Sequence, residues 1–358
     1  MRDFMRSHYK KALTVLAVGA FLWLFANQRR AFTPEVVQEL SGQTMGTSWH
    51  VQVVHAAAND KLTQTGAAIG KALTRLDKDI FSSYVIDSEL SKLNAMAVGK
   101  AMTVSRELLE VLLLSSTINR QSYGTFDITV GPLVNLWGFG PAPAAGIPGD
   151  AAIIAAMKRL GADKYDIDAR ASTVTRTADI NIDLSAIAKG YAVDKVAELL
   201  QAAGYSIFMV EIGGEVRVQG WREPETGWVV DIESPQPSPA PPIARLDNHG
   251  AVIGVASRKF LEKDGKRYSH VIDPHTGRPI DHALTAVTVL ANTVAEADAW
   301  AAAMMVLGPE AGPLLAEKRA LAVYFIIRKD EGIETRHTPG FAPYLKTEEG
   351  SGNGQAQL

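Results

Sequence analysis

Cysteine is absent from the 358-residue chain. Disulfides, thiolate nucleophiles and cysteine–metal sites are therefore excluded, and so is lipid attachment to an N-terminal cysteine. Positive charge is not in excess, because the formal net charge is -3. A broad nucleic-acid surface needs clustered positive charge, so we expect no nucleic-acid partner. Neither a Gly-x-Gly-x-x-Gly run after a strand nor a P-loop occurs, and neither standard nucleotide fingerprint applies.

The rest of the composition is ordinary for a globular protein. Hydrophobic residues make up 47% of the chain and charged residues 21%, which is enough apolar material to build a sizeable core. The length suits either two medium domains or one large domain.

One uncharged apolar run, residues 12–26, follows four basic residues near the N-terminus. Its length suits the core of a signal peptide and falls short of the roughly 20 residues of a membrane span. Small residues are missing at the positions that a signal peptidase reads, since Leu24 precedes Ala26 where cleavage would fall. We therefore expect an uncleaved anchor with its N-terminus inside, with cleavage and release as the alternative. Residues 1–30 would then be the cytoplasmic N-region and inner-membrane anchor, and the rest would lie in a bacterial periplasm.

Hydrophobic spacing divides the rest of the chain into strands and helices. Apolar alternation predicts strands at 47–56, 206–220, 227–234, 283–291 and 320–328. Helical spacing predicts helices at 62–80, 105–122, 150–162 and 295–308, with Ser105 as an N-cap and Gly308 as a stop. Because the elements lack a strict βαβ rhythm, we expect a mixed α/β (α+β) body of largely antiparallel sheets flanked by helices. This domain would span residues 31–345, and the polar tail 346–358 would be flexible.

The stretch DLSAIAKGYAVDKVAELLQAAG, residues 183–204, predicts a helix that begins after Ser185. Asp183, Lys189 and Gly190 would then stand at its N-terminal end. A helix N-terminus offers free N–H groups to a phosphate, a lysine adds a full charge, and a glycine allows another group to come close. The alternative is a capping aspartate, a solvated lysine and a glycine needed for packing.

Three further segments carry groups suited to chemistry. Residues 123–140 place four glycines and four aromatics around Asp127, which suits a planar ligand or simply a glycine-rich hairpin. Residues 268–281 carry His270, which could be a general base toward a hydroxyl or a surface histidine in a turn capped by Asp273. Asp298 could hold a hard cation such as Mg²⁺. The alternative is an acid in the first turn of a helix, where the helix dipole stabilises its negative charge.

Seven segments in order resemble the FAD:protein FMN transferase family, the ApbE-type flavin transferases. The resemblance covers roughly residues 40 to 315. It is carried by MGTSWHV at 45–51, SSYVIDSELSKLN at 82–94, GTFDITVGPLVNLWGFG at 124–140, DLSAIAKGYAVDKVA at 183–197, VEIGGEV at 210–216, SHVIDPHTGRPI at 269–280 and ADAWAAAMMVLG at 297–308.

The resemblance implies an activity and a site. Such enzymes cleave the diphosphate of FAD, move the FMN half onto a threonine hydroxyl of an acceptor protein and release AMP. The acceptors are usually extracytoplasmic or membrane-bound subunits of redox complexes. The resemblance places eight residues at the FAD site: Met45, Tyr84, Thr125, Phe126, Asp127, Asp183, Lys189 and Ile272. It implies a Mg²⁺ site at Ala186, through its carbonyl, and at Asp298, Ala301 and Ala302, and it makes His270 the base.

Two departures from the family pattern bear on this activity. The family usually has a threonine four residues after the metal aspartate, where this chain has Ala302. It also usually has Thr-Ser-Gly-Asp-Tyr shortly before the histidine motif, where this chain reads Ile253-Gly-Val-Ala-Ser257, which we expect to be a loop. An active flavin transferase is therefore our prediction. The alternatives are a degenerate relative that binds FAD or an acceptor protein without transfer, and a hydrolase that splits FAD into FMN and AMP.

Overall fold

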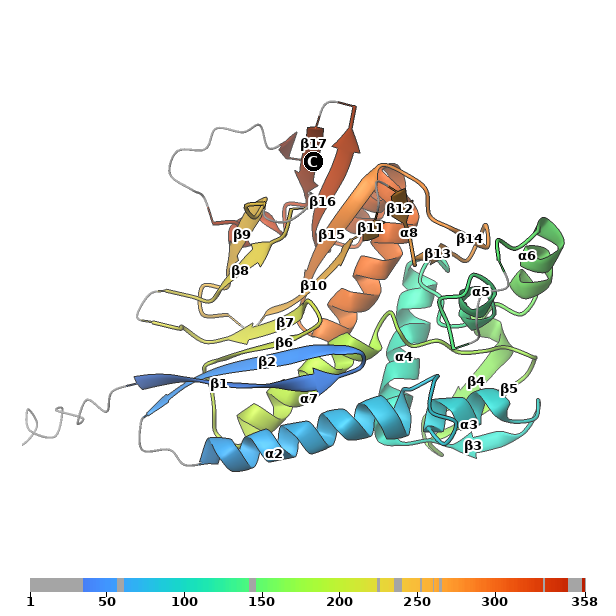
Figure 1. The fold of residues 1–358 in the computed structure, drawn as a ribbon, viewed down its shortest axis with the longest axis horizontal. Helices are drawn as coiled ribbons and strands as arrows, with labels where there is room; N and C mark the ends of the chain where they lie inside the picture. Colours follow the sequence, from blue (N-terminus) through green and yellow to red (C-terminus); the bar gives the residue numbers. More distant parts are fainter. Residues whose placement is uncertain are drawn as a thin grey trace, which may run out of the picture.

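The fold was obtained as a computed structural model (Figure 1). It describes residues 35–56, 61–141, 146–223, 226–234, 240–251, 253–259, 261–263, 266–330, 332–346 and 356–357. The expected N-region and anchor, residues 1–30, lie outside the described residues. Within the described part of the chain, α8 (Val294–Lys318) alone has the length and hydropathy of a membrane span, and most of it is buried inside the protein as a core helix.

A large sheet forms the centre of the molecule, and nine strands of the described chain contribute to it in the order β1-β2-β6-β7-β10-β15-β16-β17-β18. Their bounds are β1 Glu35–Thr44, β2 Thr47–Ala56, β6 Phe208–Ile212, β7 Glu215–Gln219, β10 Ile253–Lys259, β15 Leu284–Ala291, β16 Ala322–Lys329, β17 Gly332–His337 and β18 Ala356–Gln357. Every neighbouring pair is antiparallel except β17 and β18. The expectation of a mixed fold with antiparallel sheets is confirmed.

Smaller pairings surround the large sheet. A three-stranded sheet has the order β3-β5-β4, with bounds β3 Ala101–Thr103, β5 Thr173–Arg176 and β4 Tyr165–Asp168. Three two-stranded pairs are β8 Val229–Ile232 with β9 Ala244–Asp247, β11 Leu261–Lys263 with β12 Lys266–Tyr268, and β13 Ile272–Asp273 with β14 Arg278–Pro279. The segment 227–234, expected as a strand beside 206–220, instead pairs with β9.

Both faces of the large sheet are covered, as the sequence of β16 illustrates. Val323 and Phe325 belong to the main core, whereas the alternate residues Tyr324 and Ile326 belong to a second core with Trp228. Strand side chains alternate between faces, so a strand buried on both sides reads as a continuous apolar run. Helices α7 (Ala188–Ala202) and α8 lie along one side, and the β8–β9 hairpin lies on the other (Figure 1).

Helices α2, α3 and α4 complete the main core, whereas α5 and α6 pack with Ile272 in a third, smaller core. Their bounds are α2 Lys61–Thr74, continued by a π-helical turn at Arg75–Ile80, then α3 Glu89–Ala95, α4 Arg106–Gln121, α5 Gly131–Leu136 and α6 Asp150–Met157, with 3₁₀ turns at Ala162–Lys164 and Ala342–Tyr344. The N-cap expected at Ser105 is confirmed, because its Oγ accepts the backbone N–H of Leu108 at 3.2 Å.

Several element boundaries differ from the sequence expectation. Helix α6 ends at Met157 and does not run to residue 162. The helical segment that begins at Val294 stops at Gly308 as expected, since that residue has φ 75° and ψ -170°, and a second helical segment follows the kink to Lys318. Residues 253–257 are not a loop but most of β10, paired with β15 and in part with β7. In the expected flexible tail, Ala356–Gln357 pairs with β17, and residues 347–355 and 358 lie outside the described residues.

Helices α7 and α8 meet at a very close contact. A Cβ added to Gly190 would stand 2.5 Å from the carbonyl oxygen of Val294, and one added to Gly254 would stand 2.8 Å from the nitrogen of Val294. The first turn of α8 is therefore held between a glycine of α7 and a glycine of β10. From the sequence we expected Gly190 to let another group come close, and that group is the backbone of α8.

We predict that Gly190→Ala destabilises the protein by about 1 to 3 kcal/mol, because an added methyl group would force α7 and α8 apart in a tightly packed core. Gly70→Ala in α2 is the matched control, since nothing lies within 4 Å of its added Cβ. That control should be neutral or stabilising by about 0.5 to 1 kcal/mol. Thermal and denaturant unfolding of the two variants test this, and equal stability would contradict the contact.

Candidate functional site

Two adjoining cavities lie where α7, α8 and the segments 125–134 and 270–272 come together. The larger has a volume of about 670 Å³ and the smaller about 70 Å³. Four residues line both: Val134, Asp183, Ser185 and His270. Eleven of the thirteen residues that the resemblance implies line at least one cavity: Met45, Tyr84, Thr125, Phe126, Asp127, Asp183, Ala186, Lys189, His270, Ile272 and Ala302. The other two, Asp298 and Ala301, line neither cavity.

Met45 reaches the larger cavity from a tight turn. Met45 and Gly46 join β1 to β2, and both have positive φ, 48° and 74°. Two positive φ values are the signature of the type I′ hairpin turn, which follows the natural twist of the strands. The backbone N–H of Met45 donates to Asp77 Oδ2 at 3.0 Å, which ties the turn to the cavity wall. Asp77 itself lines the larger cavity and was not expected from the sequence.

Tyr84 lies at the outer edge of the larger cavity and is 70% exposed. Its hydroxyl donates to the carbonyl oxygen of Phe139 at 3.4 Å, and Phe139 lines the same cavity. This hydrogen bond joins two lining segments that are 55 residues apart in the sequence.

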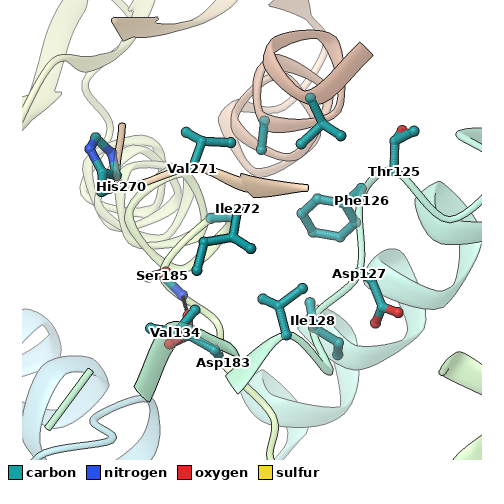
Figure 2. A pocket seen from close by; sticks show the side chains of 14 residues that line it. Thr125, Phe126, Asp127, Ile128, Val134, Asp183, Ser185, His270, Val271 and Ile272 are labelled. Atoms are coloured by element: carbon teal, nitrogen blue, oxygen red, sulfur yellow. Dashed lines mark hydrogen bonds between the residues drawn. The ribbon is translucent and has the colours of Figure 1, made fainter. Parts of the chain in front are cut away.

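The segment Thr125–Asp127 forms one wall of the smaller cavity (Figure 2). The Thr125 hydroxyl is buried and donates to the carbonyl of Ser122 at 2.9 Å. The Phe126 ring points toward Ile272 across the cavity (Figure 2), and the Phe126 carbonyl accepts from Asn119 Nδ2 at 2.8 Å. These bonds fix the wall in place before any ligand binds.

Asp127 is the carboxylate that the sequence placed among the aromatics. Its Oδ1 accepts the backbone N–H of Thr129 at 2.8 Å and the Thr129 hydroxyl at 2.7 Å. Burial raises the pKa of Asp127, and the two bonds from Thr129 oppose that shift. Asp127 therefore lines the smaller cavity as a carboxylate whose charge is costly to keep there.

Asp183 does not stand in the first turn of a helix, as the sequence suggested, because α7 begins at Ala188. It lies in the preceding loop, where its Oδ1 accepts the backbone N–H of Ser185 at 2.8 Å (Figure 2). Its own N–H donates to the carbonyl of Ile128 at 2.7 Å. The loop is thereby held between the two cavities, and Asp183 lines both.

Lys189 is in the first turn of α7, but it is not simply a free cation facing the cavity. Its Nζ lies 2.6 Å from each carboxylate oxygen of Glu215. The sequence analysis missed Glu215, although it lies in the quoted segment 210–216. The available signal was an acid beside apolar residues at the start of a predicted strand. Nothing in the sequence paired this acid with a lysine 26 residues earlier.

His270 is exposed at the junction of the two cavities, as the role of a base for an incoming substrate requires. Ile272, two residues after His270, is buried in β13 and is paired with Pro279 of β14. The backbone N–H of Val271 donates to Ser269 Oγ at 3.1 Å, which shapes the turn that carries the histidine.

The expected metal residues are divided between the cavity and the core. Ala186 and Ala302 line the smaller cavity. Asp298 is fully buried and its Oδ2 accepts the N–H of Gly190 at 3.2 Å, while Ala301 is fully buried in the core. Among the described residues, no group of three or more His, Cys, Asp or Glu side chains could hold a metal by itself.

The set of oxygen donors still suits Mg²⁺. This ion is usually held by one or two carboxylates together with waters and substrate phosphates. At the position that the resemblance implies, Asp298 would supply one carboxylate and Ala186 one carbonyl, whereas Ala302 has no side-chain oxygen. A site of this composition needs oxygens from water or from the substrate.

Asp194 is the second acid that the sequence analysis missed. Its two oxygens accept the backbone N–H groups of Val294 at 3.1 Å and Ala295 at 2.9 Å, and it forms an ion pair with Arg217. Burial raises the pKa of Asp194, and the two backbone bonds and Arg217 oppose that shift. Asp194 therefore fixes the start of α8, the helix that carries Asp298.

Comparisons with known proteins show the family of the chain. Residues 45–325 match the model of the ApbE family. A FAD:protein FMN transferase of Klebsiella pneumoniae is 37% identical over 86% of this chain and 89% of its own length. One of Haemophilus influenzae is 36% identical over 94% of this chain and 98% of its own length. The solved flavin transferase ApbE of Vibrio cholerae superimposes with a TM-score of 0.80 at 34% identity, covering 87% of this chain and 100% of the other.

Proposed function

The chain belongs to the ApbE family, and we propose that it moves the FMN half of FAD onto a threonine hydroxyl of an acceptor protein, with release of AMP. The observation that carries the proposal is the joined pair of cavities in which Lys189, Asp183 and His270 come together. The larger cavity, at about 670 Å³, has the size of a site for a sizeable organic ligand.

The chemistry follows from these positions. The threonine oxygen attacks the phosphorus of the FMN half, the bond from that phosphorus to the bridging oxygen breaks, and AMP leaves with that oxygen. His270 accepts the proton of the threonine hydroxyl. Lys189 offsets negative charge on the diphosphate, because phosphoryl transfer depends mainly on placement and charge stabilisation.

Mg²⁺ fits the same site and would supply further charge neutralisation when bound. Ala186, through its carbonyl, and Asp298 would hold it, and Ala302 lies at the position of the family's threonine without contributing an oxygen. The buried Asp298 is already aligned by the N–H of Gly190.

The N-terminal segment supports a location for this activity. Basic residues followed by the apolar run 12–26 favour an inner-membrane anchor with the domain in the periplasm. The acceptor would then be a protein with a threonine flavinylation site exposed on the same side of the membrane, for which a redox-complex subunit is the natural class.

The proposal is tested by mixing the purified full chain with FAD, Mg²⁺ and a threonine-bearing acceptor domain, and weighing the acceptor by intact mass. We expect an FMN-sized mass gain that requires Mg²⁺. His270→Ala should slow the transfer by about 10²- to 10⁴-fold, the usual contribution of general base catalysis.

The other outcomes separate the alternatives. FAD that binds but stays intact, with no gain in acceptor mass, would indicate a relative that has lost catalysis. FMN and AMP released without acceptor modification would indicate a hydrolase. Both departures from the family pattern, at Ala302 and at residues 253–257, are tolerated if the wild-type chain transfers FMN.

Ala302→Thr should tighten Mg²⁺ binding in the presence of FAD, because it restores a hydroxyl to the wall of the smaller cavity. Val306→Thr is the matched control: Val306 lines the same cavity one turn further along α8, and valine and threonine have similar shapes. Titration calorimetry with Mg²⁺ compares the three proteins. If the Ala302→Thr and wild-type titrations overlay, Ala302 is not at the metal site.

A further inference from the structure

The contact between Lys189 and Glu215 is asymmetric. Both carboxylate oxygens of Glu215 lie 2.6 Å from Lys189 Nζ. The Glu215 side chain is 2% exposed, whereas that of Lys189 is 28% exposed and lines the larger cavity. The ammonium group thus stands at the cavity wall with the carboxylate behind it.

This arrangement controls how the lysine can act. A lysine ammonium sits on a flexible four-carbon stem and carries three N–H donors. Two of those donors are matched by the two oxygens of Glu215, which leaves one for an oxygen in the cavity. A single remaining donor has a defined direction, unlike the donors of a mobile surface lysine.

The turn before Glu215 is a tight hairpin with a closing contact from Glu211. Gly213 and Gly214 connect β6 to β7, with φ values of 60° and 98°. The backbone N–H of Gly214 donates to Glu211 Oε1 at 2.7 Å. The two glycines satisfy the positive φ values of a tight hairpin, and the Glu211 carboxylate accepts the N–H within it.

We propose that Glu215 is a positioning residue that holds the Lys189 ammonium toward the diphosphate of FAD. This inference rests on the proposed function. Glu215 also carries a negative charge that weakens the general attraction of the site for an anionic substrate. Its benefit must therefore appear in the transfer step, where correct orientation matters most, rather than in the affinity for FAD.

The test is a double-mutant cycle on the full chain with Glu215→Gln, Lys189→Gln and both together. Glu215→Gln should bind FAD at least as tightly as the wild type, by flavin fluorescence, while kcat falls by about 10- to 100-fold. The double variant should be no slower than Lys189→Gln alone, because Glu215 acts through the lysine. Glu211→Gln, the same change at the other end of the turn, should leave kcat within about twofold of the wild type.

Contrary outcomes are equally defined. Losses in kcat that multiply in the double variant, or a raised KM with unchanged kcat in Glu215→Gln, would overturn the inference. If Glu215→Gln does not fold, Glu215→Asp carries the test, because it keeps the buried charge and withdraws it by one methylene. An unchanged kcat in Glu215→Asp would also contradict a positioning role.

The failure of this inference can be told apart from failure of the proposed function. A wild-type chain that transfers no FMN counts against the transferase itself. Because the inference rests on the transfer step, that result also counts against the positioning role. A wild-type chain that transfers FMN while Glu215→Gln keeps its kcat counts against the positioning role alone.

Discussion

The structure depends on an exchange of hydrogen bonds between α7 and α8, in which each helix provides a carboxylate to the start of the other. Asp194 of α7 accepts two backbone N–H groups at the start of α8, and Asp298 of α8 accepts the N–H of Gly190 at the start of α7. Each helix start carries unpaired N–H groups and partial positive charge, which an acid from the other helix satisfies. Gly190 makes the exchange possible, because any side chain there would strike the Val294 carbonyl.

This exchange sets the position of the groups that face the cavities. The start of α7 carries Lys189, and the loop before it carries Asp183 and Ala186, which line the cavities beside His270. Helix α8 brings Ala302 to the same wall. A rigid junction behind the site suits phosphoryl transfer, in which placement of the reacting groups supplies much of the catalysis.

Local patterns in the sequence predicted much of this. Alternation and helical spacing located β2, β15, β16, α2 and α4, because these elements bury a regular stripe of apolar residues. The family resemblance named eleven of the residues that line the cavities. It could not reveal the partner of Lys189, since Glu215 reaches it only through the packing of β7 beside α7. The same holds for Asp194, which reads locally as one polar position in a helix. Residues 253–257 were expected to be a loop because they stand where the family has its Thr-Ser-Gly-Asp-Tyr motif. Their β-branched and small residues instead form a buried strand.

The most direct test of the account is a crystal structure of the His270→Ala chain with FAD bound, in which the substitution slows turnover. The account predicts the flavin nucleotide within the joined cavities, with a diphosphate oxygen in hydrogen-bond distance of Lys189 Nζ while Lys189 remains on Glu215. FAD bound outside both cavities, or a diphosphate with no contact to Lys189, would contradict it.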